Sequence, residues 1–308
     1  KWRIVFLRPL GLRLVLRAVG DTRRPLYFLM AAGVMNVLGD LLFVCVLGMG
    51  VAGVALATVL SQCVSATLTV LCLTGSDGMC HLDIRRLRFY PERFAQIMKI
   101  GLPAGMQSVI FNISNVLIQS SINSFGAVAV AGNTAAANVE GFVYISMNSL
   151  YQTTLSFTSQ NLGAKQYRRV DGILVRCMIL VILIGVVLGQ GAYRLGDPLL
   201  HIYSQDPEVI AYGIQRFSVV SVTYFLCGMM DVGSGVVRGL GYSIMPMLVS
   251  MVGACVFRVI WVYTIFAHYH TIPSLYLLYA FSWTITAAAE IAYFLRCFRK
   301  LRLVPETA

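Results

Sequence analysis

This sequence of 308 residues has few charged side chains. Asp, Glu, Lys and Arg together make up 12% of the chain, whereas apolar residues make up 58%. A soluble globular domain carries about 25% charged residues, so this chain could not cover a water-facing surface with charge. The composition therefore excludes soluble enzymes and soluble nucleic-acid-binding modules, and it predicts an integral membrane protein.

The sequence also lacks the motifs of several kinds of catalysis. It contains no GxxxxGK[ST] phosphate loop, which argues against an ATP-driven pump. There is no CxxC pair, and no histidine stands beside a cysteine pair at zinc spacing. Seven of the eight cysteines lie in or beside apolar runs, as is typical of small buried side chains. We therefore predict a protein that is not an enzyme and that needs no cofactor or structural metal.

Long apolar runs dominate the sequence instead. A run of about 20 apolar residues crosses a bilayer as a helix, whereas barrel strands alternate in polarity over about ten residues. Since these runs are continuous, they predict an all-α polytopic membrane protein. We expect eight spans, at 25–47, 51–73, 100–125, 128–157, 173–193, 209–237, 247–267 and 275–295.

The net charge of +11 is concentrated in every second loop. Lys and Arg occur before the first span, in the link 74–99, after residue 157, near residue 240 and in the C-terminal tail, and they are almost absent from the loops between. Basic loops stay on the cytoplasmic side of a membrane. This pattern predicts a cytoplasmic C-terminus, and it explains the positive charge without a nucleic-acid partner.

One helix–turn–helix corner occurs twice. The corner at 17–25 matches the corner at 238–246 in an Arg, a Gly, a Thr or Ser, and a Pro at identical spacing. Gly suits the tight turn, and Pro suits the first turn of the next helix. Internal repeats are typical of secondary transporters. The repeat further predicts that about four helices of the first half precede this chain, which would then be an N-terminally truncated fragment.

Six short segments together carry a family likeness. They are LRAVGDTRRP at 16–25, NVLGD at 36–40, GVAGVALAT at 50–58, GLPAGMQ at 101–107, SQNLGA at 159–164 and VRGLGY at 237–242. In these segments the sequence resembles the MATE (multidrug and toxic compound extrusion) transporters. The resemblance implies a two-lobe helical bundle, of which the chain holds helices 5 and 6 of the first lobe and the complete six-helix second lobe.

The resemblance also sets expected domain boundaries and a function. Residues 1–73 would be the remnant of the N-terminal lobe, 74–99 a cytoplasmic inter-lobe linker and 100–308 the C-terminal lobe. Residues 1–13 do not match the apolar fourth helix expected there. The implied protein is a monomer in the lipid of a bacterial cytoplasmic membrane. It exports organic cations and other small amphipathic compounds by alternating access, in exchange for H⁺ or Na⁺.

Two alternatives remain open from the sequence. One is a flippase of lipid-linked saccharides from the related exporter superfamily, whose cavity needs cationic residues for pyrophosphate. The other is a membrane protein that transports nothing, or the product of a damaged gene. Deep carboxylates and only two deep arginines favour cationic cargo over the flippase.

Charges inside the spans are the strongest candidates for the coupling site, because a charge at the bilayer centre costs about 2.5–3.5 kcal/mol on insertion scales. Asp40 lies one helical turn after Asn36, and Thr58 follows on the next helix. The resemblance assigns these three residues to the cation- or proton-coupling site of the first lobe. The structural alternative is that Asp40 points outward or caps a neighbouring helix.

Glu140 and Asp231 are the coupling candidates of the second half. A buried Glu without a fixed cation can load and release a proton. The resemblance implies acidic residues on helices 7 and 10, but Asp231 falls about one turn later than that pattern, and Phe111 or Asn112 occupies the position on helix 7. Glu140 is a candidate replacement for that missing carboxylate, or a structural carboxyl that hydrogen-bonds between helices.

For three further charged residues inside the spans, we predict structural roles. Arg216 and Arg258 could pair with the two acids Asp231 and Glu140. Glu290 lies near enough to the cytoplasmic end of its helix for its carboxylate to reach the interface.

A polar stripe predicts a substrate cavity. Four polar residues of the span 100–125 lie at offsets of 4, 7 and 11, which places them on one helical face. In lipid, such a face turns toward protein or toward a water-filled cavity, so interhelical hydrogen bonding is the alternative. Asn133 and Tyr144, near the helical face of Glu140, are added to these four. The predicted cavity residues are therefore Ser108, Asn112, Asn115, Gln119, Asn133 and Tyr144.

Overall fold

The computed structural model describes residues 16, 20–75, 82 and 90–302. Within these ranges every regular element is a helix. The expectations for residues 1–13, and most of the linker expected at 74–99, lie outside the described residues. The chain divides into two compact units, Lys1–Ile97 and Met98–Ala308, and each is described by itself below.

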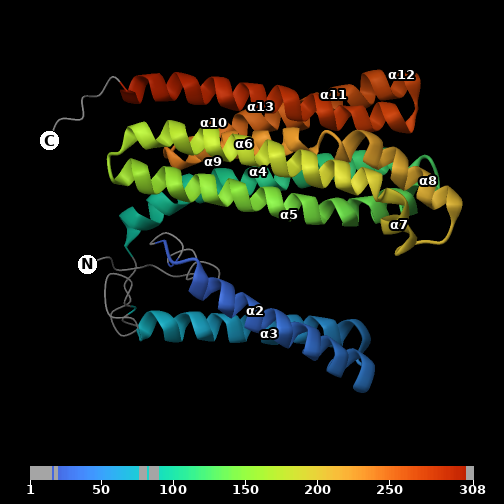
Figure 1. The fold of residues 1–308 in the computed structure, drawn as a ribbon, viewed down its shortest axis with the longest axis horizontal. Coiled ribbons are helices and arrows are strands. Elements are labelled where there is room, and N and C mark those ends of the chain that lie inside the picture. The colour runs from blue at the N-terminus through green and yellow to red at the C-terminus, as the bar shows by residue number, and fades with distance from the viewer. Residues whose placement is uncertain (1–15, 17–19, 76–81, 83–89, 303–308) are drawn as a thin grey trace. The chain divides into compact units, whose positions relative to one another are not determined.

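The first unit contains a pair of adjacent helices. Helix α2 (Arg23–Asp40) continues into a π-helical segment, η1 (Leu41–Val46), and the chain then returns in α3 (Gly50–Thr74), as Figure 1 shows. The two helices approach closely because Gly39 has no side chain. A Cβ atom at Gly39 would lie only 3.0 Å from the Cβ of Ala57. Small residues allow such close contact between helices in a membrane.

The second unit is a bundle in which α4, α5, α6, α9 and α13 run along its length (Figure 1). Shorter helices and π-helical segments (η) connect or continue them. Its elements are α4 (Pro91–Asn123, which starts in the first unit), α5 (Ala127–Gly163), α6 (Tyr167–Arg194), α7 (Gly196–His201), α8 (Pro207–Arg216), η3 (Phe217–Ser221), α9 (Tyr224–Gly239), α10 (Ile244–Ser250), η4 (Met251–Val256), α11 (Phe257–Trp261), η5 (Val262–Phe266), α12 (Ala267–Tyr269) and α13 (Ile272–Arg302).

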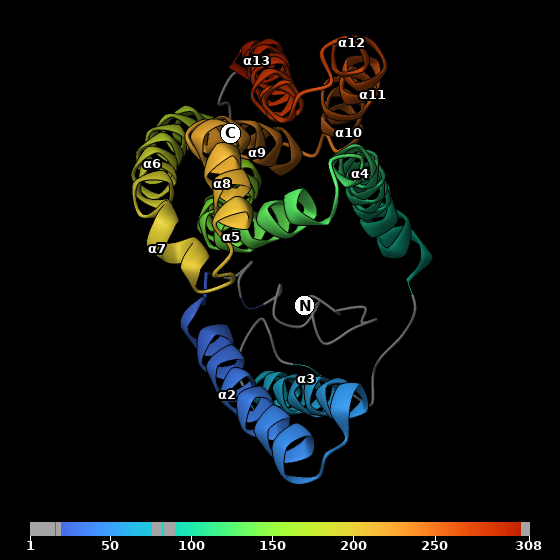
Figure 2. The ribbon, with the colours of Figure 1, turned by 90° about the vertical axis from the view of Figure 1, so that its right-hand side faces the viewer.

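Helix α9 forms the centre of this bundle. It packs against α5, α6 and α13, and the end-on view of Figure 2 shows it among them. Its residues Val232, Val236 and Val237 are fully buried in a core shared with α5 and α6. Close packing on α5 depends on Gly239, where a Cβ atom would lie 2.6 Å from the Cβ of Thr158.

The segment that leads into α9 is bent. The rod formed by α8 and η3 meets α9 at 44°. A π-helical segment interrupts the regular pattern of backbone hydrogen bonds and commonly occurs where a helix bends. Arg216, the last residue of α8, lies on the wall of the cavity described below.

Five helical stretches are long and apolar enough to cross a membrane, and the bent pair of α8–η3 and α9 would make a sixth. The chain is therefore a multi-pass membrane protein. The expected spans 100–125 and 128–157 lie in α4 and α5, which have 33 and 37 residues but are not among these stretches, because their polar residues lower the mean hydropathy. Several of those polar residues line the cavity described below. The five stretches are Arg23–Val46, Gly50–Thr74, Tyr167–Arg194, Ile244–Tyr269 and Ile272–Cys297.

Candidate functional site

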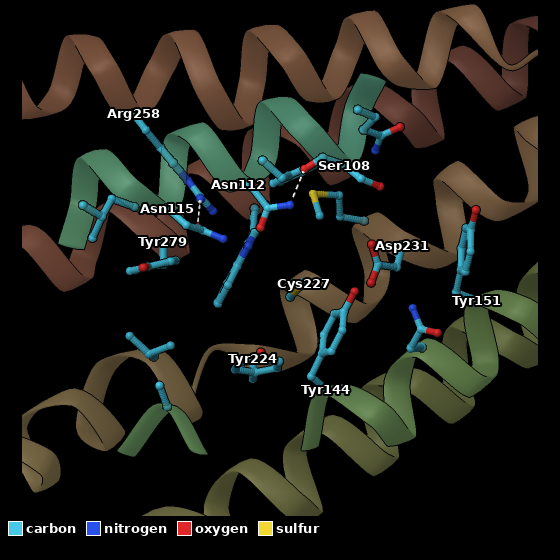
Figure 3. Close-up of a pocket in the computed structure, with 18 of the residues that line it drawn as sticks. Ser108, Asn112, Asn115, Tyr144, Tyr151, Tyr224, Cys227, Asp231, Arg258 and Tyr279 are labelled. Carbon is cyan, nitrogen blue, oxygen red and sulfur yellow. Dashed lines mark hydrogen bonds between the residues drawn. The ribbon is translucent and has the colours of Figure 1, made fainter. Parts of the chain in front are cut away.

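A cavity of about 850 Å³ lies inside the second unit, with walls from α4, α5, α9 and α13 (Figure 3). Its volume falls within the range of about 300–1,000 Å³ that is typical of small-molecule sites. All six residues predicted to face a substrate cavity lie on its wall; their contact with a substrate stays a prediction. They are Ser108, Asn112, Asn115, Gln119, Asn133 and Tyr144.

Helix α4 contributes the polar stripe to this wall. Asn112 Nδ2 donates to the carbonyl oxygen of Ser108 at 2.9 Å, a bond drawn in Figure 3. Gln119 accepts a hydrogen bond from Asn133 Nδ2 at 3.3 Å, which joins α4 to α5. On another face of α4, Ser114 Oγ donates to the carbonyl oxygen of Ala254 in η4 at 3.3 Å. The stripe therefore both faces the cavity and helps to hold α4 in place.

A buried ion pair lies at the bend between α8 and α9. Arg216 donates from Nε and Nη2 to one oxygen of Glu140, at 3.0 and 2.7 Å. Ser221, at the end of η3, donates to the other oxygen at 3.1 Å. Arg216 also donates from Nη1 to Asn133 Oδ1 at 2.7 Å. Glu140 thus binds the residue just before η3 and the last residue of η3, both on the α8 side of the bend.

This arrangement changes the interpretation of Glu140. The prediction that Glu140 loads a proton assumed that no fixed cation binds its carboxylate. The structure shows that Arg216 binds it. The expected pairing of Glu140 with an arginine is present. A coupling role for Glu140 stays a prediction, but its hydrogen bonds favour the structural alternative.

Arg258, the second intramembrane arginine, has no carboxylate partner among the described residues. It donates from Nε to Ser282 Oγ at 3.3 Å and from Nη1 to Asn115 Oδ1 at 3.2 Å. Its guanidinium carbon lies 4.8 Å from the centre of the Tyr279 ring. The expected pairing of Arg258 with an acid is therefore wrong; the chain surrounds this cation with neutral oxygens and aromatic faces instead.

Asp231 projects from α9 into the same cavity and faces Tyr144 (Figure 3). Its Oδ2 atom is buried and has no hydrogen-bond partner among the described residues. Arg238, two turns further along α9, donates instead to Tyr151 Oη at 2.7 Å and to Gln107 Oε1. Of the two acids proposed for coupling in the second half, Asp231 is the one with an unused oxygen.

The position of the Glu290 side chain differs from the one that the sequence predicted. The structure buries it completely, at 0% exposure, instead of letting its carboxylate reach the interface. It packs on α9 beside Gly233, where a Cβ atom would lie 3.1 Å from the Cβ of Glu290. Neither carboxylate oxygen has a hydrogen-bond partner among the described residues. Glu290 lies outside the cavity lining, so we assign it no substrate contact.

The three coupling candidates of the first unit are only partly brought together. Asn36 and Asp40 lie one turn apart on α2, and Asn36 Nδ2 and Asp40 Oδ1 are both buried without a hydrogen-bond partner in the described part of the chain. Thr58 lies on α3, where its hydroxyl donates to the carbonyl oxygen of Val54 at 2.9 Å. Its assignment to a shared site with Asp40 stays a prediction.

Sequence reasoning missed the aromatic part of the wall. Tyr224 of α9 and Tyr279 and Trp283 of α13 line the cavity. Aromatic residues in an apolar span look like ordinary core residues, so nothing in their spacing marks them. In the described part of the chain no three His, Cys, Asp or Glu side chains lie close enough together to hold a metal ion.

Comparison with known proteins agrees with this architecture. The MatE family model matches residues 103–264. The probable multidrug resistance protein YpnP of Bacillus subtilis is 28% identical over 244 residues, which cover 79% of this chain and 54% of YpnP. The probable multidrug resistance protein NorM of Thermotoga maritima is 25% identical over 248 residues, covering 77% of this chain and 52% of NorM. The chain thus spans about half the length of these relatives.

The fold is shared with solved transporters as well. A structure described as the outward-facing conformation of a multidrug resistance MATE family transporter matches with a TM-score of 0.88. The alignment covers 96% of this chain and 67% of that chain, at 18% identity, so it supports the fold alone. Because the MatE model covers more than half of the residues, the chain belongs to the MATE family of membrane transporters.

Proposed function

We propose that the complete protein exports small amphipathic compounds, organic cations among them, across a bacterial cytoplasmic membrane in exchange for H⁺ or Na⁺. One observation carries this proposal: a cavity of about 850 Å³ with a polar and aromatic wall lies inside a bundle of apolar helices. Similarity to proteins described as probable multidrug resistance proteins supports the class of cargo.

Export would proceed by alternating access. An ion shifts a conformational equilibrium only if it binds one state better than the other, so the coupling group must be free to bind it. Among the second-unit carboxylates that line the cavity, Asp231 meets this condition with its unpartnered oxygen. In the first unit, Asp40 has the same property.

The proposal includes an architecture and a topology. Residues 1–73 would belong to the first lobe, 74–99 to a cytoplasmic linker and 100–308 to the second lobe. The loop charges support a cytoplasmic C-terminus. The transporter would act as a monomer surrounded by lipid. The comparisons do not favour the alternative of a flippase for lipid-linked saccharides.

Export by the complete protein in proteoliposomes tests the proposal. With an imposed H⁺ or Na⁺ gradient, we expect uptake of ethidium into inverted vesicles, with counterflow of the coupling ion. Asp40→Asn and Asp231→Asn should each lower the gradient-driven rate by about tenfold or more, as typical coupling free energies imply. Asn keeps the size of Asp but cannot carry its negative charge.

Glu208→Gln is the matched control, because Glu208 is exposed in the first turn of α8 and lies outside the cavity. It should transport at the wild-type rate. Wild-type transport by both Asp variants would remove these carboxylates from the mechanism, and the absence of ethidium transport under either gradient would contradict the proposed export of organic cations.

A further inference from the structure

Arg258 is a buried cation that no carboxylate compensates among the described residues. It lies on α11, within the apolar span Ile244–Tyr269, and is only 2% exposed. A charge in such a position is costly, and buried charges are normally paired with an opposite charge. In the described part of the chain Arg258 has no ion pair, although Arg216 in the same unit has one.

The guanidinium group retains unused hydrogen-bond donors. Arginine has five N–H donors, and Arg258 uses one on Ser282 and one on Asn115. No hydrogen bond from its Nη2 to the described residues is present. The planar fork of donors in arginine matches the two oxygens of a carboxylate. Both present partners are neutral, so neither cancels the positive charge.

The surroundings hold this group at the cavity wall. The Tyr279 ring lies 4.8 Å and the Phe111 ring 6.0 Å from its guanidinium carbon, and Asn115 holds it from α4. Figure 3 shows Arg258 reaching from its helix to Asn115 beside the cavity, and Arg258 is part of the lining. A group held from several sides loses little conformational entropy when a ligand binds.

We propose that Arg258 forms a subsite for an oxyanion group, in the first place a carboxylate, on molecules that occupy this cavity. The proposal rests on the proposed function, because it assigns the cavity to transported molecules. Asp231 lies on the wall of the same cavity with an unpartnered oxygen. The cavity therefore offers one free group of each sign, which suits amphipathic molecules that carry both an amine and a carboxylate.

The other two arginines of the wall do not offer the same site. Arg216 is neutralised by Glu140. Arg238 is half-buried near the end of α9, where Tyr151 and Gln107 occupy its two terminal nitrogens. Arg258 is thus the arginine of this wall that combines deep burial, a free terminal nitrogen and no counter-charge among the described residues.

Two rhodamine dyes test the subsite in the complete purified protein. They share one ring system, but one carries a free benzoate carboxylate and the other carries its methyl ester. Fluorescence polarisation gives the dissociation constant of each dye for the wild type and for Arg258→Gln. We expect Arg258→Gln to weaken binding of the carboxylate dye by about tenfold, the loss typical of a charge-assisted hydrogen bond. Binding of the ester dye should change less than about twofold.

A second variant keeps the test informative if Arg258→Gln does not fold. Arg258→Lys retains the charge but loses the planar fork, so we expect a severalfold loss for the carboxylate dye alone. The matched control is Arg194→Gln, an exposed arginine at the end of α6 outside the cavity, which should leave both constants unchanged. An equal loss for both dyes, or no loss for the carboxylate dye, overturns the subsite.

Benzoate separates failure of the subsite from failure of the proposed function. If the wild type bound neither dye, the proposed function would fail for these amphipathic dyes. Benzoate would still test the subsite at Arg258. Millimolar benzoate should raise the thermal midpoint of the wild type and not that of Arg258→Gln; no such difference overturns the subsite. Inorganic phosphate in the same assay shows whether the site prefers carboxylates. A rise produced only by phosphatidylglycerol would assign Arg258 to a lipid headgroup and overturn the assignment to substrates.

Discussion

Arg216 and Arg258 are two buried arginines of one helical bundle, and the protein treats them differently. Arg216 makes two hydrogen bonds to Glu140 and lies at the end of α8, just before η3. Arg258 makes hydrogen bonds only to neutral oxygens and lies between aromatic rings. The first cation is compensated by a carboxylate, whereas the second has only neutral hydrogen-bond partners and aromatic rings around it among the described residues.

The two arginines thus differ in whether an opposite charge inside the protein already binds them. The negative charge of Glu140 is compensated by the guanidinium of Arg216, which binds it inside the bundle. A buried charge with only neutral hydrogen-bond partners retains its field for a ligand, and among the described residues Arg258 is of this kind. Burial alone therefore does not show which charges of this protein are left without an opposite charge.

The largest effect on stability is expected when the ion pair between Glu140 and Arg216 is broken. Glu140→Gln removes the negative charge and leaves Arg216 buried without compensation. Removal of one partner from a buried pair typically costs about 3–5 kcal/mol, so we expect a loss of that size in the free energy of unfolding. Unfolding of the purified protein in mixed micelles, followed by tryptophan fluorescence, measures it.

A double variant sharpens this test. Glu140→Leu with Arg216→Met replaces both charges by apolar groups, and such replacements are often neutral for stability. The double variant should therefore be more stable than Glu140→Gln. Equal stability of the two variants would show that the bend depends on the hydrogen bonds of the pair, and not on compensation of its charge.

An intermediate effect is expected at the unpaired arginine. Arg258→Met removes a charge without leaving an opposite charge behind, and it deletes two hydrogen bonds to neutral oxygens. A hydrogen bond to a charged group contributes about 1.5–3 kcal/mol, but removal of the buried, unpaired charge offsets part of the loss of the two bonds, so the total loss should be less than that of Glu140→Gln. The same unfolding assay compares them. A loss as large as that of Glu140→Gln would erase the distinction between the two arginines.

The smallest effect is expected from one neutral partner of Arg258. Ser282→Ala removes the acceptor of the Nε hydrogen bond but leaves Asn115 and the Tyr279 ring in place. We expect a loss of about 1 kcal/mol in the free energy of unfolding and a change below about twofold in the affinity for the carboxylate rhodamine. A larger change in that affinity would mean that Ser282 orients the guanidinium for binding.

The helical and membrane-spanning character of the chain follows from its sequence. Continuous apolar runs identified six of the eight expected spans, if the bent pair counts as one. The polar stripe on α4 identified residues that the structure places on the cavity wall, because helical spacing alone decides which side chains share a face. Glu290 shows the limit of this reasoning. Its position near a helix end suggested an exposed carboxylate, but the side chain lies against α9, and distance along one helix says nothing about a neighbouring helix.

The sequence by itself determined that this chain is a bundle of membrane helices of the MATE type and which residues carry charge inside it. Only the tertiary structure decided which of those charges compensate each other. Glu140 and Arg216 lie 76 positions apart, whereas no acid reaches Arg258 among the described residues. Local sequence determines helix formation and helix faces, because both depend on neighbours along the chain. Ion pairing depends on distances between helices, which arise only when the helices pack.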